Sequence, residues 1–301
     1  MTARIALATA AAFPDLDDDG SVLLSALESR GAQPEPAVWT DPRVDWASYD
    51  LVVVRCTWDY HERREEFLAW ADRVGSRTRL VNSPAVLRWN THKGYLRELA
   101  EAGLPVVDTT WLEPGDHFAV PAAGEYVVKP AVSAGSRDTN RYVVGEHNEL
   151  AAAHASGLLA AGRTVMVQPY LDQVDSYGET ALLCVGGEFS HAIRKGPLLE
   201  PNGAPVTGAY KEETVEVRVP TDEERAVCEA VLDKLGSVPA LDGAGRADLA
   251  YARVDLVPGP DGSPVLLELE LTEPSMFLVY DGGDGSAAAG RFADVLVAQA
   301  S

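Results

Sequence analysis

A leucine-rich strand near the C-terminus of this 301-residue chain carries acidic side chains. Residues 264–275 read PVLLELELTEPS, with Glu268, Glu270 and Glu273 inside or just after the apolar run. A carboxylate without a partner is costly to bury, so the strand must either expose one face to water or give its acids a charged partner. Strict alternation would place the leucines at 267, 269 and 271 on one face, and Leu266 with the first two glutamates on the other. A half-exposed edge strand would show the same pattern.

The residues before this strand form the other half of a predicted hairpin. A second apolar run, ADLAYARVDLV, precedes the turn sequence PGPDG. A turn centred near Asp261 would set Asp255 opposite residue 267 or 268, and directly paired residues lie about 5 Å apart. Asp255, Glu268 and Glu270 are therefore predicted to converge. Converging carboxylates repel one another unless a hard cation lies among them, and such oxygen ligands suit Mg²⁺.

The N-terminal part of the chain alternates apolar and amphipathic segments. Residues 4–12 and 50–55 are predicted strands, and residues 21–30 and 61–74 are predicted helices. This order indicates a small α/β domain over residues 1–88. In such sheets, ligand sites gather in the loops that follow the strands, here FPDLDDDG and CTWDY. Both loops are predicted walls of a substrate pocket, with ordinary packing as the alternative for their aromatic residues.

Residues 89–166 are predicted to form a second, smaller domain. Asn90 or Thr91 can cap a helix that runs to Ala102 and has Lys93 in its first turn. The strand EYVVKPAV has Lys129 in its middle and leads into SAGSRDT, residues 133–139. A small polar loop between two strands can lay backbone N–H groups over phosphates, although a flexible hairpin turn would read the same.

A third domain is predicted over residues 167–301. The segments ETALLCV and EFSHAIRK form a predicted hairpin around Gly186 and Gly187, and residues 221–235 and 286–299 are predicted helices. The sequence VQPYL contains a proline, which indicates an edge strand or a crossing between domains.

Composition argues against several classes of function. The chain has 46 acidic and 25 basic residues, and its net charge of −21 argues against binding nucleic acid or an anionic membrane. A polyanionic ligand must therefore be held by a few local cations or metal ions. The three cysteines are widely spaced, which indicates free thiols in a reducing compartment. No apolar run approaches the ~18 residues that span a membrane, so a cytoplasmic protein is expected.

The order and spacing of these motifs over roughly residues 85–280 resemble those of the ATP-grasp ligases. Lys93 in NTHKGYLRELAEAGLPV and Lys129 in YVVKP resemble the family's two phosphate-binding lysines, and SAGSRDT resembles its phosphate-covering loop. The resemblance implies an α/β and α+β architecture: an N-terminal pre-ATP-grasp α/β domain, a central lid domain and a C-terminal domain that binds ATP and Mg²⁺.

The resemblance also implies ligands for the nucleotide and the metal. The implied nucleotide-binding residues are Lys93, Lys129, Ser133, Gly135, Ser136, Gln168, Tyr170, Leu171 and Glu179. Asp255, Glu268 and Glu270 would bind two Mg²⁺ ions, with Mn²⁺ as an alternative. Many relatives have Asn where this chain has Glu270, and the extra charge should tighten metal binding or alter how the two ions are shared.

The family transfers the γ-phosphoryl group of ATP to a carboxylate, and an amine then displaces phosphate. By resemblance, Arg253 or Arg194 would neutralise the acyl phosphate, and Lys195 would face the acceptor pocket. The predicted substrate-binding residues are Asp17, Thr57, Trp58, Asp59, Tyr60 and Glu273. Acids on the N-terminal loops could hold a substrate ammonium.

Within the family, the chain resembles small actinomycete-type ligases. These include cyclo-ligases, which close a ring within one amino-acid-like substrate such as O-ureido-D-serine. Intramolecular attack is favoured by its high effective molarity. The alternatives are a ligase that joins two amino acids and a nucleotide-binding module without catalysis. The expected partner is a small amino-acid-like molecule, with a homodimer as the candidate assembly.

Overall fold

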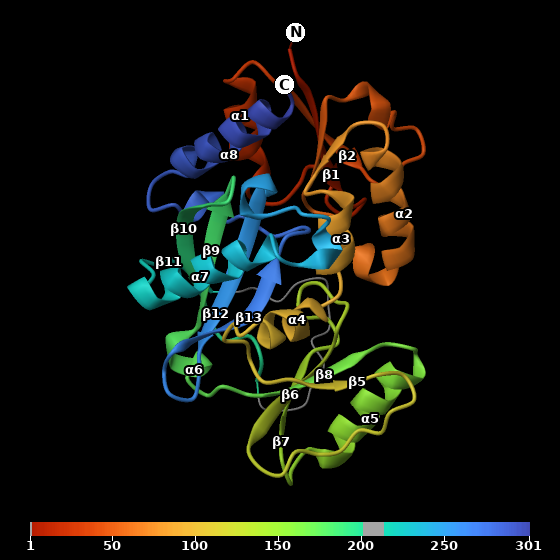
Figure 1. The fold of residues 1–301 in the computed structure, drawn as a ribbon, viewed down its shortest axis with the longest axis vertical. Coiled ribbons are helices and arrows are strands. Elements are labelled where there is room, and N and C mark those ends of the chain that lie inside the picture. The colour runs from red at the N-terminus through yellow and green to blue at the C-terminus, as the bar shows by residue number, and fades with distance from the viewer. Residues whose placement is uncertain (1, 201–213) are drawn as a thin grey trace.

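The computed structural model describes residues 2–200 and 214–301. The central sheet lies at one end of the long axis of the molecule, and both chain termini lie at the opposite end (Figure 1). Short 3-10 turns connect several elements: Trp46–Ser48, Tyr60–Glu62, Pro239–Leu241, Arg246–Asp248 and Leu278–Tyr280. Every helix in these two ranges is too short or too polar to cross a bilayer.

The N-terminal sheet is parallel, as the β-loop-α pattern predicts. Its four strands have the spatial order β2 (Gln33–Val38), β1 (Arg4–Thr9), β3 (Leu51–Val54) and β4 (Arg79–Val81). The predicted helices are α1 (Gly20–Glu28) and α2 (Arg64–Gly75). Strand β2 was not predicted, because its sequence QPEPAV contains two prolines. It lies at the edge of the sheet, where a proline removes no ladder hydrogen bond on its outer side.

The central sheet is antiparallel, and α5 (Asn148–Ala160) packs against it. Its order is β5 (Thr110–Leu112), β8 (Val165–Pro169), β6 (Glu125–Pro130) and β7 (Asn140–Val143). Of the two alternatives predicted for VQPYL, the edge strand is wrong, since β8 pairs with strands on both sides. The chain does pass from the central sheet to the C-terminal sheet directly after β8. Pro169 is tolerated because it is the last residue of the strand. The predicted domain limit at residue 166 would therefore cut β8.

Within the part of the chain that the structure describes, the C-terminal sheet has five strands. Their order is β11 (Val215–Val217), β10 (Glu188–Lys195), β9 (Glu179–Val185), β12 (Tyr251–Pro258) and β13 (Pro264–Glu270). The helices are α6 (Val174–Tyr177), α7 (Asp222–Leu235) and α8 (Ser286–Gln299). Both predicted hairpins are present, and Gly186 and Gly187 have the positive φ angles that the tight β9–β10 turn requires.

The hairpin β12–β13 has the predicted register, with Asp255 paired to Glu268 and Arg253 to Glu270. The predicted alternation along β13 is nevertheless wrong at one point. Because the register shifts after Asp255, Leu267 is an extra residue opposite β12, which makes a β-bulge. Leu266 is consequently buried in the core with Leu269, whereas Leu267 lines a cavity with the glutamates.

The predicted helix from residue 90 to 102 begins later in the structure, as α4 (Tyr95–Glu101). A separate helix, α3 (Pro84–Asn90), precedes it, and Lys93 lies in the turn between the two. Asn90 ends a helix instead of capping one, because its amide is used elsewhere. The side chain donates to the carbonyl of Leu269 (2.8 Å) and accepts from the N–H of Leu271 (2.7 Å). It thereby fixes the position of β13 at the point where the glutamates lie. Helix α4 also packs in the core of the C-terminal sheet.

Buried polar contacts join the N-terminal and C-terminal sheets. The Asn82 amide donates to the carbonyls of Tyr251 (3.0 Å) and Leu271 (2.7 Å) and accepts from the N–H of Ala250 (2.9 Å). The Tyr251 hydroxyl oxygen lies 2.9 Å from the carbonyl oxygens of Val54 in β3 and of Thr272 just after β13, and it can donate its one proton to either. Helix α8 lies beside α1 and completes the shared core (Figure 1). These contacts hold the loops of the N-terminal sheet against the residues that follow β13.

Candidate active site

A cavity lies between the central and C-terminal sheets, and the N-terminal sheet closes one side with Trp58 and Tyr60. It contains most of the residues that the sequence singled out. All nine predicted nucleotide-binding residues line it: Lys93, Lys129, Ser133, Gly135, Ser136, Gln168, Tyr170, Leu171 and Glu179. Lys195, Arg253, Glu268, Glu270 and Glu273 line it as well. Segments far apart in the sequence therefore meet here.

The two predicted phosphate-binding lysines are buried in this cavity. Lys93 forms an ion pair with Glu268 (Nζ–Oε1, 2.9 Å) and donates to the carbonyl of Ser133 (3.2 Å), so it ties β13 to the start of the loop 133–139. Burial works against the charge of Lys93, but Glu268 outweighs it and the pKa of Lys93 is raised. Neighbouring acids offset the burial of Lys129 only in part, so burial lowers the pKa of Lys129 to about 8.

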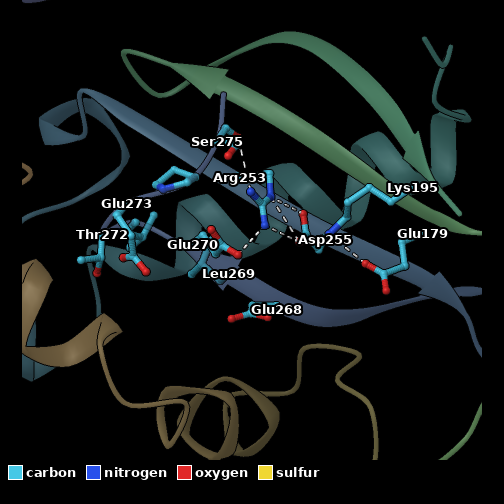
Figure 2. Close-up of polar contacts among 12 residues, drawn as sticks. Glu179, Lys195, Arg253, Asp255, Glu268, Leu269, Glu270, Thr272, Glu273 and Ser275 are labelled. Atoms are coloured by element: carbon cyan, nitrogen blue, oxygen red, sulfur yellow. Dashed lines mark hydrogen bonds and ion pairs between the residues drawn. The ribbon is translucent and has the colours of Figure 1, made fainter. Parts of the chain in front are cut away.

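Asp255 lies at the centre of a buried ion-pair network (Figure 2). Arg253 Nε donates to Asp255 Oδ1 (2.9 Å), and Lys195 Nζ donates to Asp255 Oδ2 (2.8 Å). Lys195 also pairs with Glu179 (2.9 Å). Burial opposes the negative charge of Asp255, but Arg253 and Lys195 prevail and lower its pKa to about 2. Asp255 is thus a fixed anion that positions the two basic side chains facing the cavity.

Basic side chains offset the negative charges of the remaining two acids, Glu270 and Glu273, less completely. Arg253 also pairs with Glu270, as Figure 2 shows. Despite this contact, burial raises the pKa of Glu270 to about 7, and Glu268 and Asp255 contribute to the rise. Burial and the neighbouring Glu270 raise the pKa of Glu273 well above its ordinary value. This side of the cavity therefore favours an added cation.

The three predicted metal ligands do not converge as expected. In the ranges 2–200 and 214–301, no group of three or more His, Cys, Asp or Glu side chains is close enough to hold a metal ion. Each predicted ligand is instead paired with a basic residue: Asp255 with Lys195 and Arg253, Glu268 with Lys93, and Glu270 with Arg253. The register is right, but mutual repulsion and nearby lysine and arginine side chains separate the carboxylates.

The donor set still fits Mg²⁺. Glu268 and Glu270 lie on one strand at the cavity, beside the register partner Asp255, and all three supply carboxylate oxygens. The raised pKa of Glu270 marks negative charge that its arginine partner does not fully offset. A divalent cation could take these carboxylates from their basic partners, which would then be available to an anionic ligand.

Several predicted residues lie outside the cavity lining. Arg194 neighbours Lys195 on β10, so the two side chains leave opposite faces of the sheet. It donates to the carbonyls of Tyr177 (2.7 Å) and Ser176 (3.0 Å), and its position does not support a catalytic role. Asp59 accepts from Trp39 (2.8 Å) and Arg63 (2.7 Å).

Asp17 and Thr57 also lie outside the cavity lining. Asp17 lies 3.7 Å from the guanidinium of the buried Arg55, and the Thr57 hydroxyl is buried beneath the loop. Neither lines the cavity, so the predicted role of the N-terminal acids in holding a substrate ammonium is not supported. Of the predicted substrate residues, Trp58, Tyr60 and Glu273 line the cavity.

Sequence reasoning missed residues that form the walls. Asn90 was assigned as a helix cap, and Phe277 and Ser275 were not singled out, although all three line the cavity. Only the position of the last two directly after the acidic strand could have indicated them. Leu198 and Leu199 also line the cavity, and nothing in their local sequence distinguishes them from ordinary apolar residues.

Solved ATP-grasp ligases share this fold. D-alanine–D-alanine ligase from Bacillus anthracis, in a structure complexed with ATP, has a TM-score of 0.64 at 15% identity, covering 99% of this chain and 97% of that one. The ATP-grasp ligase PsnB, complexed with a phosphomimetic variant of its minimal precursor, Mg and ADP, has a TM-score of 0.58 at 20% identity over 100% and 99% of the two chains. At these identities the likeness establishes the ATP-grasp fold.

A closer relationship appears in the sequence. Cycloserine biosynthesis protein DcsG of Streptomyces lavendulae is 39% identical over 307 residues, covering 97% of each chain. The crystal structure of D-cycloserine synthetase DcsG has a TM-score of 0.87 at 39% identity, covering 99% of this chain and 100% of that one. Residues 5–82 match the family D-cycloserine synthetase DcsG, N-terminal domain. The chain belongs to the DcsG family of ATP-grasp ligases.

Proposed function

We propose that this protein is an ATP-dependent, ADP-forming carbon–nitrogen ligase that closes a ring within one amino-acid-like substrate, as a D-cycloserine synthetase does. The observation that carries the proposal is the 39% identity to DcsG over 97% of both chains. The cavity supports it independently, because three lysines, an arginine and a set of carboxylates meet beside a small polar loop. These are the groups that phosphoryl transfer requires for positioning and charge neutralisation.

The cavity residues have distinct proposed roles. Lys93 and Lys129 would hold ATP phosphates, with the loop from Ser133 to Thr139 over them. Mg²⁺, as two ions or with Mn²⁺ in its place, would bind Asp255, Glu268 and Glu270. When bound, the metal neutralises charge on the transferring phosphate. The remaining nucleotide contacts proposed are Ser133, Gly135, Ser136, Gln168, Tyr170, Leu171 and Glu179.

The reaction would form and consume an acyl phosphate. The substrate carboxylate attacks the γ-phosphorus, ADP leaves, and a nitrogen of the same substrate then attacks the acyl carbon and expels phosphate. Arg253 faces the cavity and is rigidly held by Asp255, so it is the arginine proposed to neutralise the acyl phosphate, with Lys195 beside it.

The three-part division is retained as a proposal, with residues 1–88, 89–166 and 167–301 as acceptor, lid and ATP-binding parts. The second limit is better placed after β8, and α4 is better grouped with the C-terminal sheet. A cytoplasmic location and a homodimer are part of the same proposal.

The decisive experiment is a substrate panel. With ATP and Mg²⁺, O-ureido-D-serine alone should release ADP and inorganic phosphate and give a cyclic product, detected by mass spectrometry. A requirement for two different amino acids would indicate an intermolecular ligase instead. ATP binding without turnover on any single compound or pair would indicate a nucleotide-binding module. AMP and pyrophosphate as products would contradict attack at the γ-phosphorus.

Nucleotide affinity is expected to fall as the pH rises through about 8. Lys129 has a pKa of about 8, so it carries its proton below that pH and loses it above. An anionic ligand favours the protonated lysine, and the affinity for ADP should therefore fall by about tenfold between pH 7.5 and pH 9.5. Calorimetric titration at both values would measure the change.

The matched control for this prediction is Lys129→Arg. Arginine stays protonated throughout this pH range, so the variant should bind ADP with similar affinity at both values. If wild type and variant respond equally to pH, the titration belongs to a group other than Lys129.

A further inference from the structure

The segment of residues 273–278, which follows β13, is fixed by side chains of the N-terminal sheet. Trp58 Nε1 donates to the carbonyl of Glu273 (3.0 Å), and Arg55 donates to the carbonyl of Pro274 (3.0 Å). Asp19 accepts from the backbone N–H groups at positions 276 (3.0 Å) and 278 (2.6 Å). The buried acid and arginine of the N-terminal loops thus serve to hold this segment.

The C-terminal sheet holds the same segment from its other side. Arg253 donates to the carbonyl at position 275 (3.3 Å), and His191 Nε2 donates to the carbonyls at positions 276 (3.0 Å) and 277 (3.1 Å). Each residue from Glu273 to Leu278 therefore has a backbone group bonded to a side chain. Such a constrained backbone fixes where the Glu273 side chain leaves the chain.

Glu273 differs from the other acids of the site in having no counterion. Four of the five carboxylates pair with a basic side chain: Glu179 and Asp255 with Lys195, Glu268 with Lys93, and Glu270 with Arg253. Glu273 is 8% exposed, and its carboxylate forms no hydrogen bond or ion pair within residues 2–200 and 214–301. In Figure 2 no dashed line reaches it.

An unpaired carboxylate that is buried and rigidly placed is costly for the fold. Groups of this kind are retained where a ligand supplies the missing partner. The cavity near Glu273 is bounded by Trp58 and Tyr60 of the N-terminal sheet, on the side proposed for the substrate. Of the other acids proposed for an ammonium, Asp17 is ion-paired with Arg55 and Asp59 accepts from Trp39.

We propose that the Glu273 carboxylate binds the primary ammonium group of the substrate and selects α-amino acids over analogues without that group. This inference rests on the proposed ligase function and identifies the residue that recognises its substrate class. The substrate's ammonium supplies the direct ion-pair partner that Glu273 does not have among the described residues. Its carboxylate can then point toward the phosphate-binding lysines, while a second nitrogen remains free to attack.

The test compares two substrates in three proteins. The substrates are O-ureido-D-serine and its analogue with hydrogen in place of the amino group, which keeps the carboxylate and the second nitrogen. The proteins are wild type, Glu273→Gln and, as a matched control, Glu65→Gln, which makes the same change on an exposed part of α2. The rate of ADP release gives kcat and KM for each combination of protein and substrate. Calorimetry gives the affinity of each protein for ADP with Mg²⁺, and thermal unfolding checks that each variant is folded.

In Glu273→Gln, kcat/KM for the amino substrate should fall by about 10- to 100-fold, mainly through KM, as expected for loss of a charged hydrogen bond. The value for the analogue should change by less than about threefold, so the variant loses its discrimination, and Glu65→Gln should match wild type.

Two results would overturn this assignment alone. If Glu273→Gln lowers kcat/KM equally for both substrates, Glu273 does not recognise the ammonium. If it instead weakens binding of ADP with Mg²⁺, the carboxylate serves the metal. A wild-type protein that releases no ADP with either compound would overturn both the proposed function and the assignment, and would be seen before any variant is compared.

Discussion

Glu268→Gln is expected to reduce ATP-dependent turnover by about 10²–10³-fold, the largest effect on catalysis predicted for a single change in this protein. The substitution keeps the shape of the side chain but removes one of the charges proposed to bind Mg²⁺. It also removes the charged partner of Lys93, whose Nζ lies 2.9 Å from Glu268 Oε1. ADP release under saturating ATP, Mg²⁺ and substrate would measure the loss.

The fold should survive this change with a moderate cost. The glutamine oxygen can still accept a hydrogen bond from the buried lysine, so the free energy of unfolding should fall by about 1–2 kcal/mol. Glu229→Gln, on an exposed position of α7, is the matched control and should leave turnover unchanged. Wild-type turnover in Glu268→Gln would refute its role as a metal ligand and leave Glu268 as the partner of Lys93.

Arg253→Ala is expected to have the largest effect on stability. The guanidinium donates to both oxygens of Asp255, to Glu270 and to the carbonyl of Ser275. Removing it leaves carboxylates in the core without one of their partners, and breaking such buried pairs costs about 3–5 kcal/mol. Chemical denaturation followed by fluorescence would measure the decrease in the free energy of unfolding.

Arg253→Lys separates charge from geometry. Lysine keeps the charge but cannot reproduce the planar fork that joins Asp255, Glu270 and Ser275. Turnover should therefore fall by about 10²-fold while much of the stability is retained. Arg194→Lys changes the other predicted arginine, which lies outside the cavity lining, and its turnover should stay within about threefold of wild type. The opposite ranking of the two lysine variants would restore Arg194 as the catalytic arginine.

The Arg253 network also shows which feature of Asp255 the sequence predicts, its strand pairing, and which it does not, its ion-pair partners. Its pairing with Glu268 followed from the length of one turn between two apolar runs, and the structure has that register. Its contacts with Lys195 (2.8 Å) bring together strands β10 and β12, which are 60 residues apart at this contact. No local pattern indicates which basic residue a carboxylate will meet across a sheet.

The sequence by itself determined those strands, helices and turns that depend on residues close together in the chain. Apolar periodicity defined β9, β10, β12, β13, α7 and α8, and glycine pairs and proline–glycine turns defined where the hairpins reverse. The positions of Lys93, Lys129 and the acidic strand were enough to indicate a nucleotide site, because the order of charged residues among these elements was itself informative.

Only the tertiary structure decided how individual side chains are used. Asn90 has the sequence context of a helix cap, but its side chain donates to the backbone of β13. Asp17 and Asp59 were predicted to bind the substrate, but Asp17 is ion-paired with Arg55, and Asp59 accepts hydrogen bonds from Trp39 and Arg63. Glu273 reads like the other glutamates, yet it alone among the five carboxylates of the site has no basic partner in the described parts of the chain. The physical reason is that a polar group takes its partner from whatever long-range packing brings within about 3 Å, and burial then decides what that contact is worth.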